Sequence, residues 1–206
     1  MPGIASKPAF LEKNFNELIE SFIENKVGIT DNFLGTVLAT NLKANLTGYY
    51  EEKLLVSGGT GNKTLVTQDK LLRSDKIYWL DRMHHNVHEN EFFDLMDRFI
   101  AYLNDTCYTG ISGCEFHYTL YEEGSFYKKH IDQFRNDEGR KYSMVMYLND
   151  GWTASDGGEL RIHHSDSRQQ NISPDSGKSV FFKSSELEHE VLVTNKPRMS
   201  ITGWLK

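Results

Sequence analysis

The segment from His117 to Asp132 reads HYTLYEEGSFYKKHID, two short runs of β-forming residues separated by the turn signal Glu122-Glu-Gly124. Runs of this kind, bounded by turn residues, predict two β-strands joined by a turn. His130 and Asp132 stand two positions apart at the end of the second run. Because side chains at positions i and i+2 of a strand point to the same side, this imidazole and this carboxylate are expected to converge on one point.

A third group from a distant segment would complete a metal site. The candidate is His189, in the stretch ELEHEVLV. Two histidines and one carboxylate, with the remaining coordination positions open, form the ligand set of non-haem Fe(II) oxygenases. A His-x-Asp tripeptide is weak evidence by itself, and His189 alone would be better interpreted as a histidine at the edge of a core. The interpretation therefore depends on the rest of the chain.

From Gly113 to the C-terminus, short β-forming runs alternate with turn signals that contain Gly, Pro, Asn and Asp. The predicted strands lie near residues 114–121, 125–131, 141–148, 158–163, 168–172, 178–183, 189–194 and 198–205. Short strands at this even spacing indicate a sandwich or a barrel.

The first half of the chain carries apolar residues at helical spacing in three segments, 14–27, 31–42 and 88–104. An extension of the second helix to Tyr50 is left open because Gly48 interrupts it. These helices precede the strands instead of alternating with them, which argues against a doubly wound parallel sheet. The predicted fold class is mainly β with N-terminal helices (α+β), in one domain that spans residues 1–206. Residues 1–112 would support a β core formed by residues 113–206.

Between the second and third helices, Ser57–Ser74 begins with a Gly-rich polar stretch, which predicts a long loop. A loop of this length inside a compact domain is either functional and mobile or disordered. The segment Lys76–Leu80 that follows it is predicted to be a strand. Three histidines come next, namely His84, His85 and His88. No acidic or cysteine partner stands at ligand spacing from them, so we interpret them as part of a solvated turn and not as a metal site.

The composition is ordinary for a globular protein, with 38% hydrophobic and 25% charged residues among 206. The formal net charge of -6 argues against a general nucleic-acid binder. No apolar run approaches the length needed to cross a bilayer, and the first ten residues lack the apolar core of a signal peptide. We therefore expect a cytoplasmic protein with no membrane or nucleic-acid partner, in which Cys107 and Cys114 are reduced.

Six motifs follow one another in a fixed order in the second half of the chain. They are Tyr121-x-x-Gly124-x-x-Tyr127-x-x-His130-x-Asp132, Tyr147-Leu-Asn-Asp150, Gly157-Gly-Glu-Leu160, Pro174-x-x-Gly177, His189-Glu-Val191 and Arg198-x-Ser200-x-Thr202-Gly-Trp204. This order resembles the prolyl 4-hydroxylase group of Fe(II)/2-oxoglutarate dioxygenases, and most closely the HIF prolyl hydroxylases and their bacterial relatives. A weaker resemblance extends to Arg73–Leu80. The resemblance implies a double-stranded β-helix (a jelly-roll, cupin-like core) buttressed by helices.

The resemblance also implies roles for individual residues. The Fe(II) ligands would be His130, Asp132 and His189. The cosubstrate 2-oxoglutarate would meet Arg198, Tyr147, Tyr121, Thr202, Leu160 and Val145. The substrate would contact Arg140, Trp204 and Tyr127. The loop Ser57–Ser74 would close over the substrate. The chain departs from the family pattern in one place, because the segment from Tyr121 to His130 is about one residue shorter than in HIF prolyl hydroxylases.

The implied reaction is hydroxylation of a prolyl residue in a protein or peptide, with dioxygen consumed and succinate and CO2 released. A requirement for ascorbate is left open, as is the oligomeric state. Two alternatives stand beside this reading: a dioxygenase for a free amino acid or another small molecule, and a non-enzymatic cupin-like barrel that binds a ligand. The complete ligand triad together with Arg198 argues against the binding barrel, because such a barrel has no need of open metal positions.

Overall fold

The computed structural model describes residues 7–59, 71–133 and 139–206, with side chains from residue 11 onward. The long helices are α1 (Lys7–Asn25), α2 (Thr36–Glu51) and α3 (Val87–Cys107). The strands are β1 (Val27–Thr30), β2 (Val56–Ser57), β3 (Lys76–Trp79), β4 (Cys114–Tyr121), β5 (Tyr127–His130), β6 (Tyr142–Tyr147), β7 (Leu160–His163), β8 (Gln169–Ile172), β9 (Ser179–Lys183), β10 (Glu188–Val191) and β11 (Arg198–Leu205). Two single turns of 3-10 helix cover Arg82–His84 and Ala154–Asp156.

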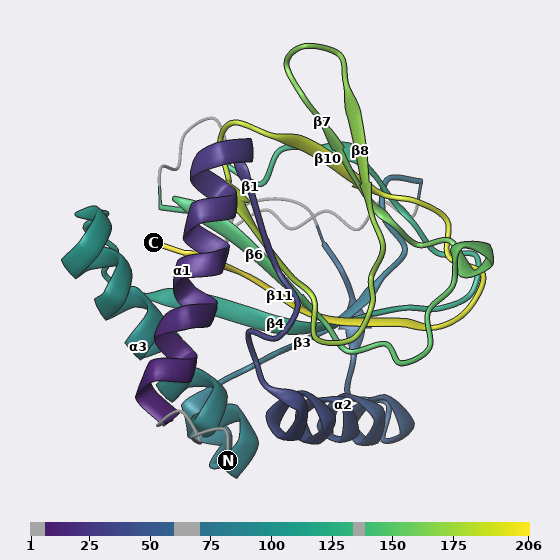
Figure 1. The fold of residues 1–206 in the computed structure, drawn as a ribbon. Coiled ribbons are helices and arrows are strands. Elements are labelled where there is room, and N and C mark those ends of the chain that lie inside the picture. The colour runs from purple at the N-terminus through teal and green to yellow at the C-terminus, as the bar shows by residue number, and fades with distance from the viewer. Residues whose placement is uncertain (1–6, 60–70, 134–138) are drawn as a thin grey trace, which may run out of the picture.

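The strands form two antiparallel sheets. The larger sheet has the order β1-β9-β6-β11-β4-β3-β2, and the smaller sheet has the order β5-β10-β7-β8. Figure 1 shows the helices on one side of the larger sheet, while β7, β8 and β10 of the smaller sheet lie on the other side. This is the double-stranded β-helix that the order of motifs predicts.

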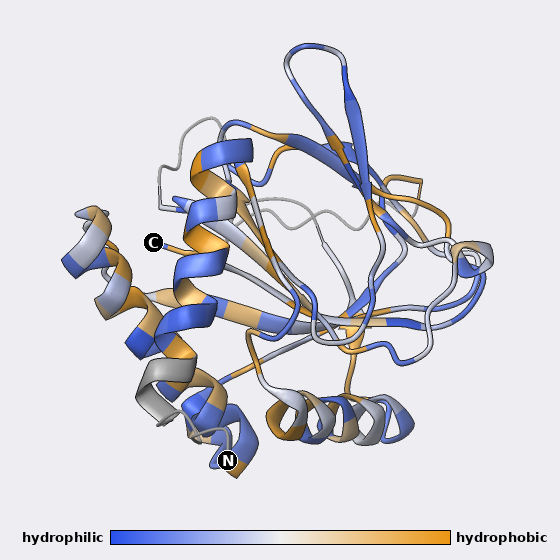
Figure 2. Ribbon diagram, viewed as in Figure 1, coloured by the Kyte–Doolittle hydropathy of each residue, from blue (hydrophilic) through white to orange (hydrophobic). Residues whose placement is uncertain are grey.

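The larger sheet separates two apolar clusters because its side chains alternate between its two faces. One cluster joins the helices to the sheet, and the aromatic rings of Phe15, Phe33 and Phe99 contact one another in it. Figure 2 shows the matching pattern on α1 and α3, where hydrophobic and hydrophilic residues alternate along each helix. The second cluster lies between the two sheets and includes Tyr147 and Leu160. The helices therefore cover one face, and the other face is left for the site.

The start of the chain differs from the prediction. The segment Val27–Thr30 forms an edge strand paired with β9, where a helix end followed by a helix start at Asp31 was expected. Gly28 explains how this strand fits, because a Cβ atom there would lie 2.4 Å from the main-chain oxygen of Leu18. The second helix begins only at Thr36 and continues through Gly48 to Glu51.

The stems of the predicted loop are described, but its centre, residues 60–70, lies outside the described residues. On the C-terminal stem, Arg73 forms an ion pair with Asp75 and donates a hydrogen bond to the main-chain oxygen of Gly59. The same stem pairs with the smaller sheet, where the main-chain N–H of Lys128 donates to the oxygen of Leu72. In the part of the chain that the structure describes, no helix is long and apolar enough to cross a membrane.

Candidate metal centre

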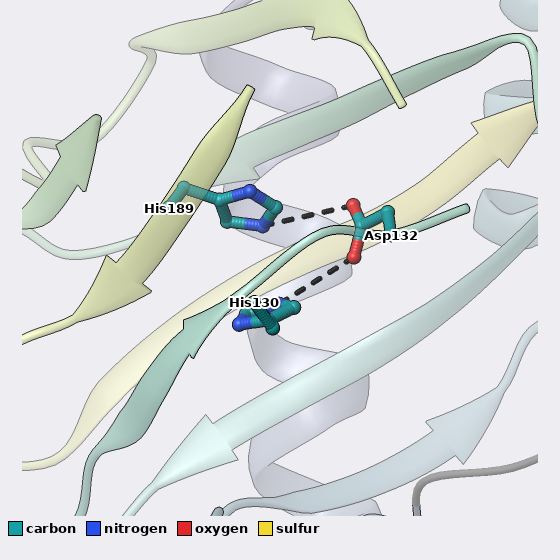
Figure 3. A group of neighbouring side chains, drawn as sticks. All are labelled: His130, Asp132 and His189. Atoms are coloured by element: carbon teal, nitrogen blue, oxygen red, sulfur yellow. Dashed lines mark ion pairs between the residues drawn. The ribbon is translucent and has the colours of Figure 1, made fainter. Parts of the chain in front are cut away.

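The three predicted metal ligands meet at one point. His130 and His189 are direct partners across the antiparallel pair β5–β10. Asp132 lies two residues beyond the end of β5. The sequence had predicted a longer strand, near residues 125–131. Its carboxylate oxygens are 3.5 Å from Nε2 of His130 and 3.7 Å from Nε2 of His189, as Figure 3 shows. Among the described residues, this is the group of acidic, His and Cys side chains that could hold a metal ion.

The hydrogen bonds of the two imidazoles to the main chain involve Nδ1, so Nε2 of each ring is available to bind a metal ion. Nδ1 of His130 is 2.7 Å from the main-chain oxygen of Lys128, and Nδ1 of His189 is 3.1 Å from that of Leu187. A carbonyl oxygen can only accept, so each Nδ1 carries a proton, and in the neutral imidazole Nε2 then presents a lone pair. Two lone pairs and a carboxylate then face one another. Three acceptors that converge in this way fit a bound cation, since without one they repel.

The charge state of the centre also fits metal binding. Burial by itself would raise the pKa of Asp132, but the charges of His189 and His130 and a hydrogen bond from Ser143 hold that pKa well below its usual range. Burial, together with the neighbouring His130, lowers the pKa of His189 to about 4. At neutral pH the centre therefore offers an ionised carboxylate and a neutral imidazole, which are the forms that bind a metal ion.

A buried cation lies at the other end of the inter-sheet space. Arg198, at the start of β11, is 1% exposed, and its guanidinium carbon is 5.0 Å from the ring centroids of both Tyr121 and Tyr147. Its Nε donates a hydrogen bond of 2.7 Å to the oxygen of Gly158. A Cβ atom at position 158 would come within 2.9 Å of Oγ1 of Thr194, so only glycine fits against this arginine.

Two features of the surroundings of Arg198 indicate an anionic ligand. No ion pair to Arg198 is present among the described residues, although a buried guanidinium is costly without an anionic partner. The hydroxyl of Tyr147 is fully buried and has no hydrogen-bond partner. Buried polar groups are normally satisfied, so a phenol without a hydrogen-bond partner next to a guanidinium without an ion-pair partner points to a carboxylate that both would bind.

Three of the remaining residues predicted for the cosubstrate belong to one cluster. Val145, Leu160 and Tyr121 lie with Tyr147 in the inter-sheet cluster. Thr202 pairs with Val145 across β11–β6 and is half-buried.

The three residues predicted for the substrate lie near the metal centre. The ring of Tyr127 stacks on that of His130 with centroids 3.6 Å apart, and Nη1 of Arg140 is 3.3 Å from the main-chain oxygen of Asp132. The guanidinium of Arg140 also covers the ring of Trp204 at 3.4 Å.

Several neighbours of the site were missed by sequence reasoning. Ser143 donates a hydrogen bond of 2.6 Å to Oδ2 of Asp132, and Arg73 covers the free face of Tyr127 at 4.3 Å. The rings of Trp79, His117 and Trp204 lie side by side on the sheet face of the site. Strand alternation could have found Ser143, which precedes Tyr147 by four positions, and His117, which precedes Tyr121 by four.

Comparisons with known proteins report similarity to oxygenases. The family described as the 2OG-Fe(II) oxygenase superfamily matches residues 116–206. Among curated proteins, the prolyl 3-hydroxylase OGFOD1 of Xenopus laevis is 34% identical over 77 residues, which cover 32% of this chain and 15% of that protein. The chain thus spans a small part of the length of this relative.

Solved structures extend the likeness to nearly the whole chain. A prolyl-4-hydroxylase of Pseudomonas putida is 30% identical, with a TM-score of 0.83 over 93% of this chain and 98% of that one. A prolyl hydroxylase of Trichoplax adhaerens, solved with a peptide fragment of the hypoxia inducible factor oxygen degradation domain, has a TM-score of 0.86 at 24% identity, over 99% of this chain and 94% of that one. The chain belongs to the prolyl 4-hydroxylase group of the 2OG-Fe(II) oxygenase superfamily and is a dioxygenase that uses Fe(II) and 2-oxoglutarate.

Proposed function

We propose that this enzyme hydroxylates a prolyl residue in a protein or peptide substrate. The observation that carries the proposal is the 30% identity to a bacterial prolyl-4-hydroxylase over 98% of that chain, together with the group of His130, Asp132 and His189 that could hold a metal ion. The Trichoplax relative, which has the same fold, was solved with a peptide. The aromatic side chains near the centre support a substrate of this size, since Trp79 is 44% exposed beside His117 and Trp204.

We assign roles to the residues as follows. Nε2 of His130, the carboxylate of Asp132 and Nε2 of His189 would hold Fe(II). When bound, Fe(II) supplies the activation of dioxygen that couples decarboxylation of 2-oxoglutarate to hydroxylation of a C–H bond. Arg198 and Tyr147 would bind the carboxylate of 2-oxoglutarate that is farther from the metal, because a planar guanidinium and a phenol suit a carboxylate in a dry pocket.

The other residues would orient and shield the reactants. Tyr121 and Thr202 would contact the cosubstrate between the apolar walls formed by Val145 and Leu160. Tyr127, Arg140 and Trp204 would place the target proline over the centre and exclude water from it. A cytoplasmic location, a requirement for ascorbate and the organisation of residues 1–206 as one domain stay predictions.

A proteome-wide modification assay tests the proposal. Denatured and native lysates of the source cells, depleted of the enzyme, would be incubated with Fe(II), 2-oxoglutarate and either the wild-type chain or the Asp132→Ala variant. We expect +16 Da on prolines of one or a few proteins with the wild type only. Hydroxylated free amino acids without any modified protein would instead favour the small-molecule alternative. Succinate formed in parallel should match the amount of hydroxyproline.

A further inference from the structure

The aspartate of the metal centre is held differently from the two histidines. His130 and His189 sit in the ladder between β5 and β10, so hydrogen bonds of the sheet fix their positions. Asp132 lies beyond the end of β5 and has no place in that ladder. The next residue, Gln133, donates its main-chain N–H to the oxygen of Ser184 at 3.2 Å. This contact ties the segment to the end of β9, a strand of the larger sheet.

A second connection to the larger sheet runs through side chains. Oγ of Ser143, on β6, is 2.6 Å from Oδ2 of Asp132 and 2.9 Å from Oγ of Ser184. Ser143 and Ser184 are 1% and 0% exposed, so water does not compete for these contacts. The three groups therefore form a short buried chain of hydrogen bonds that ends on the ligand carboxylate.

The chemistry of the groups fixes the direction of this chain. An ionised carboxylate has no proton to give, so Oγ of Ser143 must donate its only proton to Oδ2 of Asp132. The contact between the two hydroxyls then requires Ser184 to donate to Ser143. A hydroxyl that receives a hydrogen bond becomes a better donor, so Ser184 strengthens the bond from Ser143 to the carboxylate.

The sequence places both hydroxyls beside buried apolar residues of the inter-sheet cluster. On β6, Ser143 shares its sheet face with Val145 and Tyr147, and it pairs with Phe182 of β9. Ser184 follows two positions after Phe182 and is buried as completely. Buried hydroxyls cost free energy unless they are hydrogen-bonded, so two adjacent serines here need a partner that repays the burial. That partner is the carboxylate of Asp132.

We propose that Ser143, supported by Ser184, is a positioning residue that holds the carboxylate of Asp132, through Oδ2, where its oxygens face Nε2 of both histidines. The proposal rests on the metal centre of the proposed function. Without the hydroxyl of Ser143, the carboxylate is free to rotate and Oδ2 loses its donor, so the ligand is no longer preorganised.

The test is a metal titration of the purified full chain, free of 2-oxoglutarate and oxygen, with Co(II) as the probe. Affinity is measured by calorimetry, and the visible bands of Co(II) report the coordination geometry. We expect Ser143→Ala to weaken Co(II) binding by about 10–100-fold and to change the bands. Ser143→Thr, which keeps a hydroxyl, should restore most of the affinity. Ser184→Ala should give a smaller loss than Ser143→Ala, because Ser184 acts through Ser143.

The matched control is Ser179→Ala, another buried serine of the same sheet. Its hydroxyl has no hydrogen-bond partner, and Ser179 pairs with Met146, which belongs to the helix-side cluster. Its Co(II) affinity should equal that of the wild type. Urea unfolding of each metal-free variant identifies any that fail to fold, and in that case Ser143→Thr and Ser184→Ala carry the test.

Unchanged Co(II) affinity and unchanged bands in a folded Ser143→Ala variant would overturn the proposal. This outcome is separate from a failure of the proposed function. A wild-type chain that binds Co(II), loses affinity on Ser143→Ala and yet hydroxylates no proline would support the positioning role and contradict the prolyl substrate. A wild-type chain that binds no Co(II) would overturn both.

Discussion

The two faces of the larger sheet are made from the same strands and have opposite characters. Along β11, Arg198, Ser200 and Thr202 lie on the face opposite the helices and alternate with Met199 and Ile201, which belong to the helix-side cluster. The helix side is dominated by apolar side chains, although it also buries the carboxylate of Glu89. The other side buries a guanidinium, hydroxyls and an unpaired phenol. Apolar burial on one face of the sheet thus raises the free energy of unfolding. The polar groups buried on the other face lower it, and they are in place to bind ligands.

Removing an aromatic ring from the helix side should give the largest effect and should act on stability alone. The ring of Phe99 lies within 5.8 Å, centroid to centroid, of those of Phe15, Phe33 and Phe181, and Phe99 is fully buried. Phe99→Ala should lower the free energy of unfolding by about 3–5 kcal/mol because it leaves a cavity. Urea unfolding measures the loss. The variant that remains folded should bind metal and 2-oxoglutarate like the wild type, and a large loss of affinity would contradict the separation of the two faces.

The opposite substitution, on the site face, should act mainly on binding. Arg198→Ala should weaken 2-oxoglutarate binding by about 2–5 kcal/mol, since one partner of a buried charge-assisted pair is lost. Affinity is measured by calorimetry on the Mn(II)-loaded enzyme without oxygen. Metal binding should stay close to normal. Arg168→Ala, an exposed arginine near the tip of the β7–β8 hairpin, is the control. Unchanged affinity for 2-oxoglutarate in the Arg198 variant would remove this residue from the site.

The polar face should also make stability depend on pH. Burial, with the nearby charge of Arg73, lowers the pKa of His117 to about 4, below the ordinary value of about 6.5. The folded state therefore binds fewer protons than the unfolded state between these values, so stability falls as the pH drops from about 6.5 toward 4. Between pH 7 and pH 5 the contribution of His117 should amount to about 1–2 kcal/mol.

Urea midpoints of the metal-free protein at the two pH values measure this dependence. His117→Gln should reduce it, whereas His85→Gln, at an exposed position, should leave it as it is. An unaltered dependence in His117→Gln would show that other groups are responsible.

The smallest effect should have opposite signs for stability and for binding. Tyr147→Phe removes a buried hydroxyl that has no hydrogen-bond partner in the protein. The metal-free variant should be as stable as the wild type, or more stable by up to about 1 kcal/mol, because an unsatisfied polar group is gone. Its affinity for 2-oxoglutarate should fall by about 0.5–1.5 kcal/mol, the net value of one hydrogen bond. A loss of stability without a loss of affinity would assign the hydroxyl to the core.

Much of this arrangement could be predicted from the sequence, because it depends on local patterns. Strand alternation and turn residues predicted the β-rich second half, and the ordered motifs predicted the metal ligands that the structure brings together. The pairing of β1 with the far strand β9 could not be read from Val27–Thr30, which is four residues long and flanked by helical patterns. The contact of Arg73 with Tyr127 was equally hidden, because it joins segments 54 positions apart that pair only in the folded chain.

The sequence correctly predicted that Asp132 lies beside His130, but strand alternation explains only part of this arrangement. The rule that positions i and i+2 of a strand share a side placed this carboxylate beside His130. In the structure the strand ends at His130, and the hydrogen bond from Ser143 to the carboxylate, with that from the main chain of Gln133 to Ser184, brings the carboxylate back. Such long-range bonds leave no periodic trace in a sequence.

The centre draws its ligands from both layers of the β-helix. Two imidazoles belong to the smaller sheet, and the carboxylate is anchored to the larger one through Ser143. An ion bound here would therefore cross-link the two sheets. Ligand binding to the native state alone raises the free energy of unfolding by RT ln(1 + [L]/Kd), about 2.7 kcal/mol at one hundred times Kd. Removal of the metal by a chelator should loosen the contact between the two sheets first. Hydrogen exchange of the β5 and β10 amides should therefore become faster before that of the strands and helices in the helix-side cluster.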